Sequence, residues 1–179
     1  MNIQELTKLI YENGISELKK HQDNGVDFSI VDSHSKGNLL ISYSTYGYNE
    51  HYTQSEMVEF LLESGIDVNY QPNGRDNGKS ALHKAAANGH FELLSALVEN
   101  GANVEIKDKN GNTPLWNCVM MCRGNETQIE IIKYLISKGG SLETKNNHGI
   151  SPKDIINDLG LGIDKGNNQK DWDLRFLLS

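Results

Sequence analysis

Pairs of apolar residues recur along the chain at positions i, i+1, i+4 and i+5, which is the pattern of a helix that buries one side. The residues of three such segments are Met57, Val58, Leu61 and Leu62; Leu93, Leu94, Leu97 and Val98; and Ile131, Ile132, Leu135 and Ile136. Each segment is followed by a glycine (Gly65, Gly101 or Gly139), where a left-handed C-cap is usual. The pattern predicts three similar amphipathic helices that end at these glycines.

The region around the central helix is repeated one unit later. NGKSALHKAAANGHFELLSALVENGAN begins at Asn77, and NGNTPLWNCV begins at Asn110. Gly78 and Gly111 are 33 residues apart, which is the period of a turn followed by two short antiparallel helices. Ordering a backbone costs roughly 1–2 kcal/mol per residue, and one helix pair buries only one apolar stripe. The units must therefore stack, which predicts an all-α solenoid with short hairpin-like loops.

The repeated unit resembles the ankyrin repeat. The residues that match the family pattern are Gly78, Ser80, Ala81, Leu82, His83, Ala85, Ala86, Gly89, His90, Leu93, Leu94, Leu97, Val98, Gly101, Ala102 and Asn103. The resemblance implies a binding scaffold whose partner is set by surface residues. It also implies that His83 hydrogen-bonds hydroxyls near the turns, at Ser80 or Thr113. The short form, the acidic balance and the GNTPLW variant are similar to small stand-alone bacterial ankyrin proteins, some of which are antidotes to basic toxins.

The pattern, followed outward, predicts one domain over residues 1–179 with five units, at about 1–32, 33–72, 73–107, 108–145 and 146–179. The first and last units are degraded, as capping repeats tend to be. In the second unit we take Ile41 as the leucine of the helix start. Ile41 to Gly65 and Leu115 to Gly139 are each 24 residues, against 19 in the central unit, and we place the five extra residues between the helices.

Several motifs that would suggest chemistry are weaker than they look. GRDNGKS has three residues between its glycines instead of the four of a phosphate loop, and we interpret Asn77-Gly78 as a hairpin turn and Ser80 as an N-cap. Cys118 and Cys122 give no disulfide framework and are interpreted as buried thiols, with metal or redox use as the alternative. No ligand or catalytic cluster is recognisable, so we expect no metal, no cofactor and no enzyme, with a site assembled across repeats left open.

Charge and hydropathy narrow the class of partner. The formal net charge is −7, which argues against a nucleic-acid ligand. No apolar run approaches 18 residues and no secretory signal opens the chain, so we expect no membrane partner and a cytoplasmic location. Between Lys36 and Arg75 there is no Lys or Arg, whereas five of the seven tyrosines lie there among acidic residues. This segment is either a solvated acidic face with packing tyrosines or a contact surface for a basic protein.

The resemblance also indicates which residues face a partner, because ankyrin partners lie against the hairpin tips and the exposed side of the first helices. The second and fifth residues after the leucine of each helix start are expected to point outward, with Trp116 beside them. The predicted protein-binding residues are Tyr43, Tyr46, Tyr48, Glu56, Glu59, Arg75, Lys84, Lys109, Trp116, Asn117 and Met120.

These observations together predict a non-enzymatic protein-binding solenoid that is a monomer when free. With no second domain in the sequence, we expect it to bind and block a basic protein, as an antidote or immunity-type inhibitor does. The alternatives are an adaptor or scaffold subunit in a larger assembly and an enzyme with an unrecognised site across repeats.

Overall fold

The computed structural model describes residues 1–46, 51–74, 76–122, 124–158, 174 and 178. Within these residues there are nine α-helices, and β-structure is limited to one isolated antiparallel bridge between Val31 and Asn38. The helices are α1 (Ile3–Glu12), α2 (Ile15–Asp23), α3 (Leu39–Tyr46), α4 (Gln54–Glu63), α5 (Ala81–Asn88), α6 (Phe91–Glu99), α7 (Pro114–Met121), α8 (Glu126–Ser137) and α9 (Pro152–Asp158). The predicted all-α fold is confirmed.

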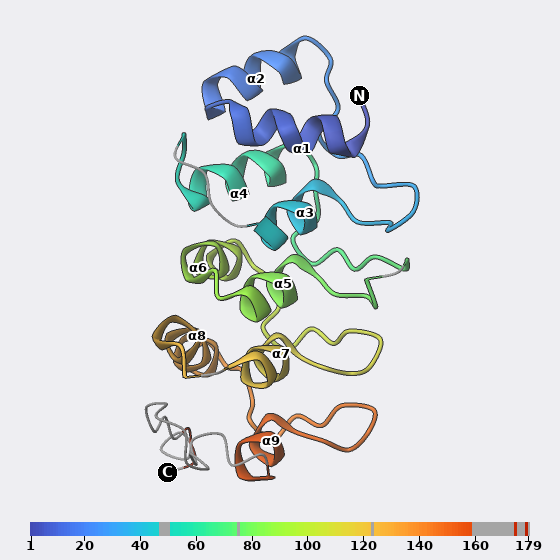
Figure 1. Ribbon diagram of the computed structural model, residues 1–179. Helices are drawn as coiled ribbons and strands as arrows, with labels where there is room; N and C mark the ends of the chain where they lie inside the picture. The colour runs from blue at the N-terminus through green and yellow to red at the C-terminus, as the bar shows by residue number, and fades with distance from the viewer. Residues whose placement is uncertain (47–50, 75, 123, 159–173, 175–177, 179) are drawn as a thin grey trace, which may run out of the picture.

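The helices are stacked in two parallel rows (Figure 1). One row contains α1, α3, α5, α7 and α9, which we call the inner helices; the other contains α2, α4, α6 and α8, the outer helices. Each inner helix contacts the next inner helix along the stack. The hairpin loops that precede α3, α5, α7 and α9 project beyond the inner helices, on the side away from the outer helices. The architecture is therefore a solenoid in which each helix pair contacts only its neighbours.

The core between the rows is built from the recurring apolar residues. Helix α6 packs against α4 on one side and α8 on the other. Its Leu93, Leu94 and Leu97 are at most 1% exposed, and the first three apolar residues of the matching segments in α4 and α8 are fully buried as well. Each such side chain contributes about 1.5–3 kcal/mol when it is buried completely. The predicted stacking of these segments is thus present in the structure.

The hairpin tips are hydrogen-bonded to one another through their backbones. The Lys109 N–H donates to the carbonyl of Asn77 (2.9 Å), and the Asn147 N–H donates to the carbonyl of Asn110 (2.9 Å). The tips approach so closely that Gly111, at φ 76°, has no room for a side chain: an added Cβ would lie 2.6 Å from Asn147 Oδ1 and 2.8 Å from its backbone nitrogen. The tips that precede α5, α7 and α9 are thus linked in series along one edge of the solenoid.

His83 connects α5 to the hairpin of the following unit. Its Nδ1 lies 2.9 Å from Ser80 Oγ, as the resemblance implied, and its Nε2 lies 2.9 Å from the carbonyl oxygen of Asn112 rather than from the Thr113 hydroxyl. The Ser80 N–H also donates to Nδ1. Burial lowers the pKa of His83 to about 4, because desolvation penalises the charged ring. The neutral imidazole therefore donates its Nε2 proton to Asn112 and closes the junction between α5 and α7.

The register predicted for the second unit is wrong by one residue. Helices α3, α5 and α7 each have eight residues, and aligning their first residues places Leu40, and not Ile41, with Leu82 and Leu115. Asn38 precedes α3, and its Oδ1 accepts a hydrogen bond from the Ile41 N–H (3.0 Å), as a cap does. The run Leu39-Leu40-Ile41 is apolar at every position, so hydrophobicity alone does not distinguish the two registers.

The five extra residues of the fourth unit are also distributed differently from the prediction. Helices α7 and α8 are joined by four residues, 122–125, where Gly89 and His90 alone join α5 to α6. Helix α8 has 12 residues and α6 has nine. Two of the five residues therefore lengthen the connection, and the other three lengthen the second helix.

Candidate protein-binding surface

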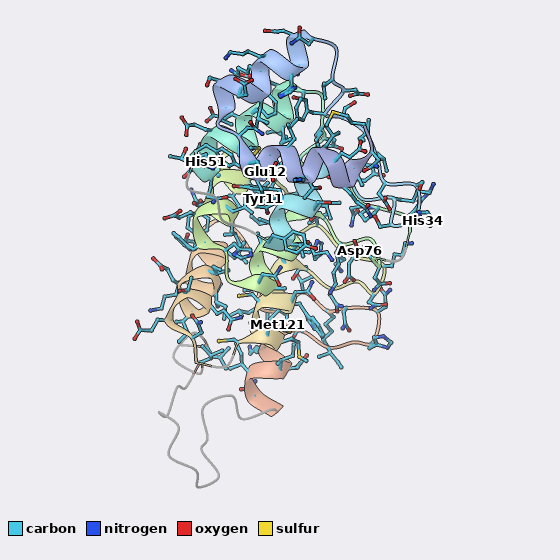
Figure 2. The ribbon with its side chains drawn as sticks, turned by 45° about the horizontal axis from the view of Figure 1, so that its top comes forward. Tyr11, Glu12, His34, His51, Asp76 and Met121 are labelled. Atoms are coloured by element: carbon cyan, nitrogen blue, oxygen red, sulfur yellow. The ribbon has the colours of Figure 1, made fainter. Side chains whose placement is uncertain are left out.

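Exposed apolar side chains are concentrated on one side of the solenoid. We call this side the inner surface; it consists of the exposed side of the inner helices together with the hairpin tips. In the described part of the chain, the exposed large apolar side chains are Met1, Val31, Tyr46, Met120, Met121 and Ile150. None of them belongs to an outer helix. Figure 2 shows Met121 at α7 and Tyr11 on α1, with His34 and Asp76 out on the hairpins.

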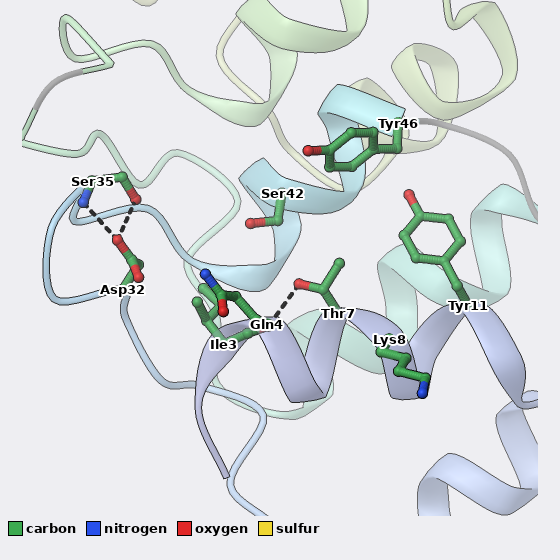
Figure 3. Close-up of a pocket in the computed structure, with 9 residues that line it drawn as sticks. All are labelled: Ile3, Gln4, Thr7, Lys8, Tyr11, Asp32, Ser35, Ser42 and Tyr46. Atoms are coloured by element: carbon green, nitrogen blue, oxygen red, sulfur yellow. Dashed lines mark hydrogen bonds between the residues drawn. The ribbon is translucent and has the colours of Figure 1, made fainter.

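One cavity of the inner surface lies between α1 and α3, and we call it the N-terminal cavity (Figure 3). Its volume is about 670 Å³, and it is lined by Ile3, Gln4, Thr7, Lys8, Tyr11, Asp32, Ser35, Ser42 and Tyr46. The rings of Tyr11 and Tyr46 meet edge to face, with centroids 6.4 Å apart. Asp32 Oδ1 accepts hydrogen bonds from the Ser35 N–H (2.6 Å) and hydroxyl (2.9 Å), which lower the pKa of the Asp32 carboxyl. This cavity thus combines aromatic faces with an ionised carboxylate.

A second cavity lies between α7 and α9, and we call it the C-terminal cavity. Its volume is about 510 Å³, and it is lined by Asn110, Asn112, Trp116, Met120, Asn146, His148, Ile150, Asp154 and Ile155. Asp154 Oδ2 accepts hydrogen bonds from the Ser151 hydroxyl (2.7 Å) and N–H (2.8 Å), and these bonds lower the pKa of the Asp154 carboxyl. The predicted site residues Trp116 and Met120 both belong to this cavity, the first half-buried and the second 41% exposed.

Polar residues occupy the inner surface between the two cavities. Lys84 Nζ lies 3.1 Å from Asp76 Oδ1, and its side chain is 20% exposed. Lys109 Nζ donates to the carbonyl of Asn73 (2.9 Å). The structure therefore places both predicted lysines on the inner surface, where each is held by a neighbouring hairpin.

Two predicted contact residues are buried instead of exposed. Tyr43 is fully buried, and its hydroxyl donates to Gln54 Oε1 (2.7 Å); with the corrected register it occupies the place of Ala85, against the core. Burial raises the pKa of Tyr43. Asn117 is 5% exposed on α7, which packs against α5 on one side and α9 on the other. Neither residue can anchor a partner as the structure stands.

The acidic and aromatic residues of the second unit do not form one surface. Glu56 and Glu59 lie on α4, an outer helix, and are exposed there. Glu56 Oε2 accepts hydrogen bonds from the Thr53 N–H and hydroxyl as part of an N-terminal capping box. Tyr52 is directed inward, where its hydroxyl donates to the carbonyl of Ile10 (2.6 Å). Tyr43 and Tyr46 therefore lie on α3, an inner helix, whereas Glu56 and Glu59 lie on the outer row.

Two further predicted contact residues, Tyr48 and Arg75, lie outside the described residues. Among the residues that are described, no group of three or more His, Cys, Asp or Glu side chains could hold a metal ion.

Cys118 and Cys122 are buried, and desolvation raises the pKa of both thiols, so both stay protonated near neutral pH. No helix in this part of the chain has the length and apolar character needed to cross a membrane.

Sequence reasoning missed several residues of the inner surface. They are Tyr11, Asp32, Met121, Ile150 and Asp154. Tyr11 and Asp32 belong to a unit without a recognisable helix start, which left no register from which to count. Met121 and Tyr46 occupy the same last helical position, one residue beyond the fifth place after the leucine, so counting to the fifth place passes over Met121.

Comparison with known proteins decides the family. The family profile described as ankyrin repeats, in three copies, matches residues 48–146. The chain belongs to the ankyrin repeat family. Ankyrin repeats are protein–protein interaction modules.

Several proteins are similar to this ankyrin repeat chain. Ankyrin repeat-containing protein P1E11.10 of Schizosaccharomyces pombe is 37% identical over 105 residues, covering 58% of this chain and 45% of the relative. Protein phosphatase 1 regulatory subunit 27 of Mus musculus is 35% identical over 80 residues, covering 45% and 49%. Ankyrin repeat protein OPG189 of Variola virus is 31% identical over 132 residues, covering 73% and 22%. The chain spans less than half the length of each of these relatives.

Proposed function

We propose that the protein is a non-enzymatic inhibitor that binds a basic protein on its inner surface and blocks it. The distribution of exposed apolar side chains carries the proposal: Tyr46, Met120, Met121 and Ile150 lie on inner helices or a hairpin, and the described outer helices expose none of comparable size. Aromatic and methionine side chains are the ones that anchor protein interfaces, and methionine adapts to irregular partner surfaces.

Charge supports a basic partner. The net charge of −7 attracts a positively charged protein over the range that salt leaves unscreened, about 8 Å at physiological ionic strength. In this proposal the exposed carboxylates of the outer helices raise the association rate, whereas the apolar residues of the inner surface set the lifetime of the complex.

Blocking is supported by one relative whose name states a regulatory role, a regulatory subunit of protein phosphatase 1. An antidote to a basic toxin is the specific form of inhibitor that fits the acidic charge. The alternative is an adaptor or scaffold subunit, which is favoured by the larger size of the relatives, since in the virus protein the matched region is 22% of the whole.

The test is affinity capture from the source organism with three forms of the full chain. The parent is compared with an inner-surface variant (Tyr46→Ser, Met120→Ser, Met121→Ser) and a matched outer-helix variant (Glu59→Ser, Glu92→Ser, Glu130→Ser), each checked for folding by thermal melt. All six substituted residues are exposed. We expect a basic protein that the parent and the outer-helix variant retain and that the inner-surface variant loses.

A captured protein then separates the two functions. An inhibitor abolishes the activity of its partner at stoichiometric ratio, whereas an adaptor leaves that activity intact and brings a third protein into the complex. Equal capture by the inner-surface variant and the parent would contradict the proposed surface.

A further inference from the structure

The two cavities at the ends of the inner surface share one chemical composition. Each contains an aromatic ring and one carboxylate: Tyr46 with Asp32 in the N-terminal cavity, and Trp116 with Asp154 in the C-terminal cavity. Both carboxylates accept two hydrogen bonds from a neighbouring serine, which keeps them ionised. Figure 3 shows Asp32 and Ser35 on one side of the N-terminal cavity and the Tyr46 and Tyr11 rings on the other.

This composition fits the side chain of arginine or lysine. The apolar stem of such a side chain packs on an aromatic face, its cation is attracted by that face, and the head group pairs with the carboxylate. Two of the nearby cations pair with exposed carboxylates: Lys8 lies 3.7 Å from Glu12, and Lys153 lies 2.5 Å from Glu143. The charges of Lys145 and Lys153 contribute to the lowered pKa of Asp154, and His34 contributes to that of Asp32. Each cavity therefore offers a carboxylate that a partner cation can approach.

The stacking of the inner helices fixes the separation of the cavities. The N-terminal cavity lies between α1 and α3, and the C-terminal cavity lies between α7 and α9, so three inter-helix steps separate them. Packed helices are about 8–10 Å apart, which gives a separation of about 24–30 Å. An extended chain covers this distance in about eight residues at 3.3 Å per residue, and an α-helix needs about 18 at 1.5 Å per residue.

We propose that the two cavities receive two basic side chains of one extended partner segment, spaced about eight residues apart. The inference rests on the proposed function, and it deepens it by naming the chemistry that the inner surface recognises. Between the cavities the segment crosses α3, α5 and α7, and on α5 it meets the polar side chains of Lys84, which pairs with Asp76, and Asn88, which is exposed and donates to the Thr45 carbonyl. Neither cavity alone holds the partner strongly, since each contributes one partly exposed ion pair. When one segment occupies both cavities it binds far more tightly, because the second contact forms within an existing complex.

The test uses linear random peptides displayed on phage, about 24 residues long, which is enough for either conformation. The peptides are selected on the full chain and then made synthetically. We expect selected sequences to carry two Arg or Lys residues about eight positions apart. Asp32→Asn and Asp154→Asn should each weaken a selected peptide about three- to tenfold. Both substitutions retain an oxygen that accepts from the neighbouring serine, which preserves the local fold.

Cutting a selected peptide between its two basic residues should weaken binding by about 100-fold or more. The matched control is Glu92→Gln, which removes an exposed carboxylate of α6 that lines neither cavity and should leave affinity unchanged. The inference is overturned if the selection returns no peptide with paired basic residues, if scrambled peptides bind equally well, or if the spacing is the 18 or so of a helix. Because no native partner is used, such a failure leaves the affinity-capture test of the proposed function untouched.

Discussion

Two neighbouring junctions of the solenoid differ at the third residue of the leading helix, which is His83 in α5 and Trp116 in α7. Between α5 and α7, His83 reaches the Asn112 carbonyl and closes the junction. Between α7 and α9, Trp116 stands at the same helical position, its Nε1 is buried without a partner among the described residues, and the C-terminal cavity lies beside it. An unsatisfied buried donor costs about 1–3 kcal/mol. The third helical residue thus closes the first junction, whereas the second is held at its hairpin, where Asn146 Nδ2 donates to Asn112 Oδ1 (2.8 Å), and a cavity stays open beside Trp116.

The largest expected effect is the loss of folding stability when the apolar core that supports both junctions is disrupted. Leu94→Asp places an unpaired carboxylate at a fully buried position between α4 and α8. The loss of stability should exceed about 4 kcal/mol, a large fraction of the roughly 5–15 kcal/mol by which native domains are stable. Circular dichroism during a thermal melt measures it. Glu92→Asp, an exposed change on the same helix, is the control and should melt like the parent.

Tyr43→Ala should create a new gap beside α3, where the chain has a large residue in the place of Ala85. We expect a loss of about 3–5 kcal/mol of stability from the lost packing. Tyr43→Phe removes only the hydroxyl bonded to Gln54, at a cost of about 1 kcal/mol. Chemical denaturation of both variants measures the two losses. A Tyr43→Ala chain as stable as the parent but unable to bind its partner would return Tyr43 to the contact surface.

Acid should weaken the closed junction selectively. The pKa of His83 is about 4 in the folded chain, against an ordinary 6.5 for a histidine side chain, so the unfolded chain takes up the proton first. The contribution of the neutral ring is complete above pH 6.5 and is lost as the pH falls towards 4, about 3 kcal/mol at 1.36 kcal/mol per unit. Denaturation at pH 7 and pH 4 measures the loss for the parent and for His83→Gln. The variant should lack this component, and identical pH profiles for the two proteins would contradict the assignment.

The smallest effects should come from Cys118 and Lys79, whose residue types suggest metal, redox or nucleotide chemistry. Cys118→Ala introduces the residue that α5 has in the same place, Ala85, and should cost about 1 kcal/mol or less. Lys79→Ala should change stability by less than about 0.5 kcal/mol, as surface substitutions usually do. ATP binding, measured by calorimetry, should be absent in the parent and in both variants. Specific ATP binding that Lys79→Ala removes would overturn the reading of GRDNGKS as a turn.

The sequence predicted the stack better than it predicted the surface. The helix pairs, the outer-helix core and the turn at Asn77-Gly78 follow from a periodic pattern in which each unit supports the assignment of the next. The surface depends on register, and the apolar run at Leu39 gave no local signal with which to fix it. Closeness in sequence also does not show whether two residues lie on the same row of helices. Tyr46 and Glu56 are ten residues apart, yet they lie on an inner and an outer helix.

The cavities were beyond sequence reasoning for a related reason. Each is formed where two units meet, so its lining comes from segments distant along the chain, such as Gln4 with Ser42 or Asn110 with Asp154. The carboxylates Asp32 and Asp154 look like ordinary turn and cap residues in the sequence, because both bond a nearby serine. Only the stacking brings them beside an aromatic ring.

Methionine methyl NMR tests the central claim, that the inner surface binds the partner, most directly. The chain has four methionines, of which Met120 and Met121 are exposed on α7 and Met57 is buried in α4. With ¹³C-methyl methionine in the full chain, adding the captured partner to saturation should shift or broaden the Met120 and Met121 signals and leave Met57 in place. A saturated complex in which both α7 signals are unchanged would contradict the account.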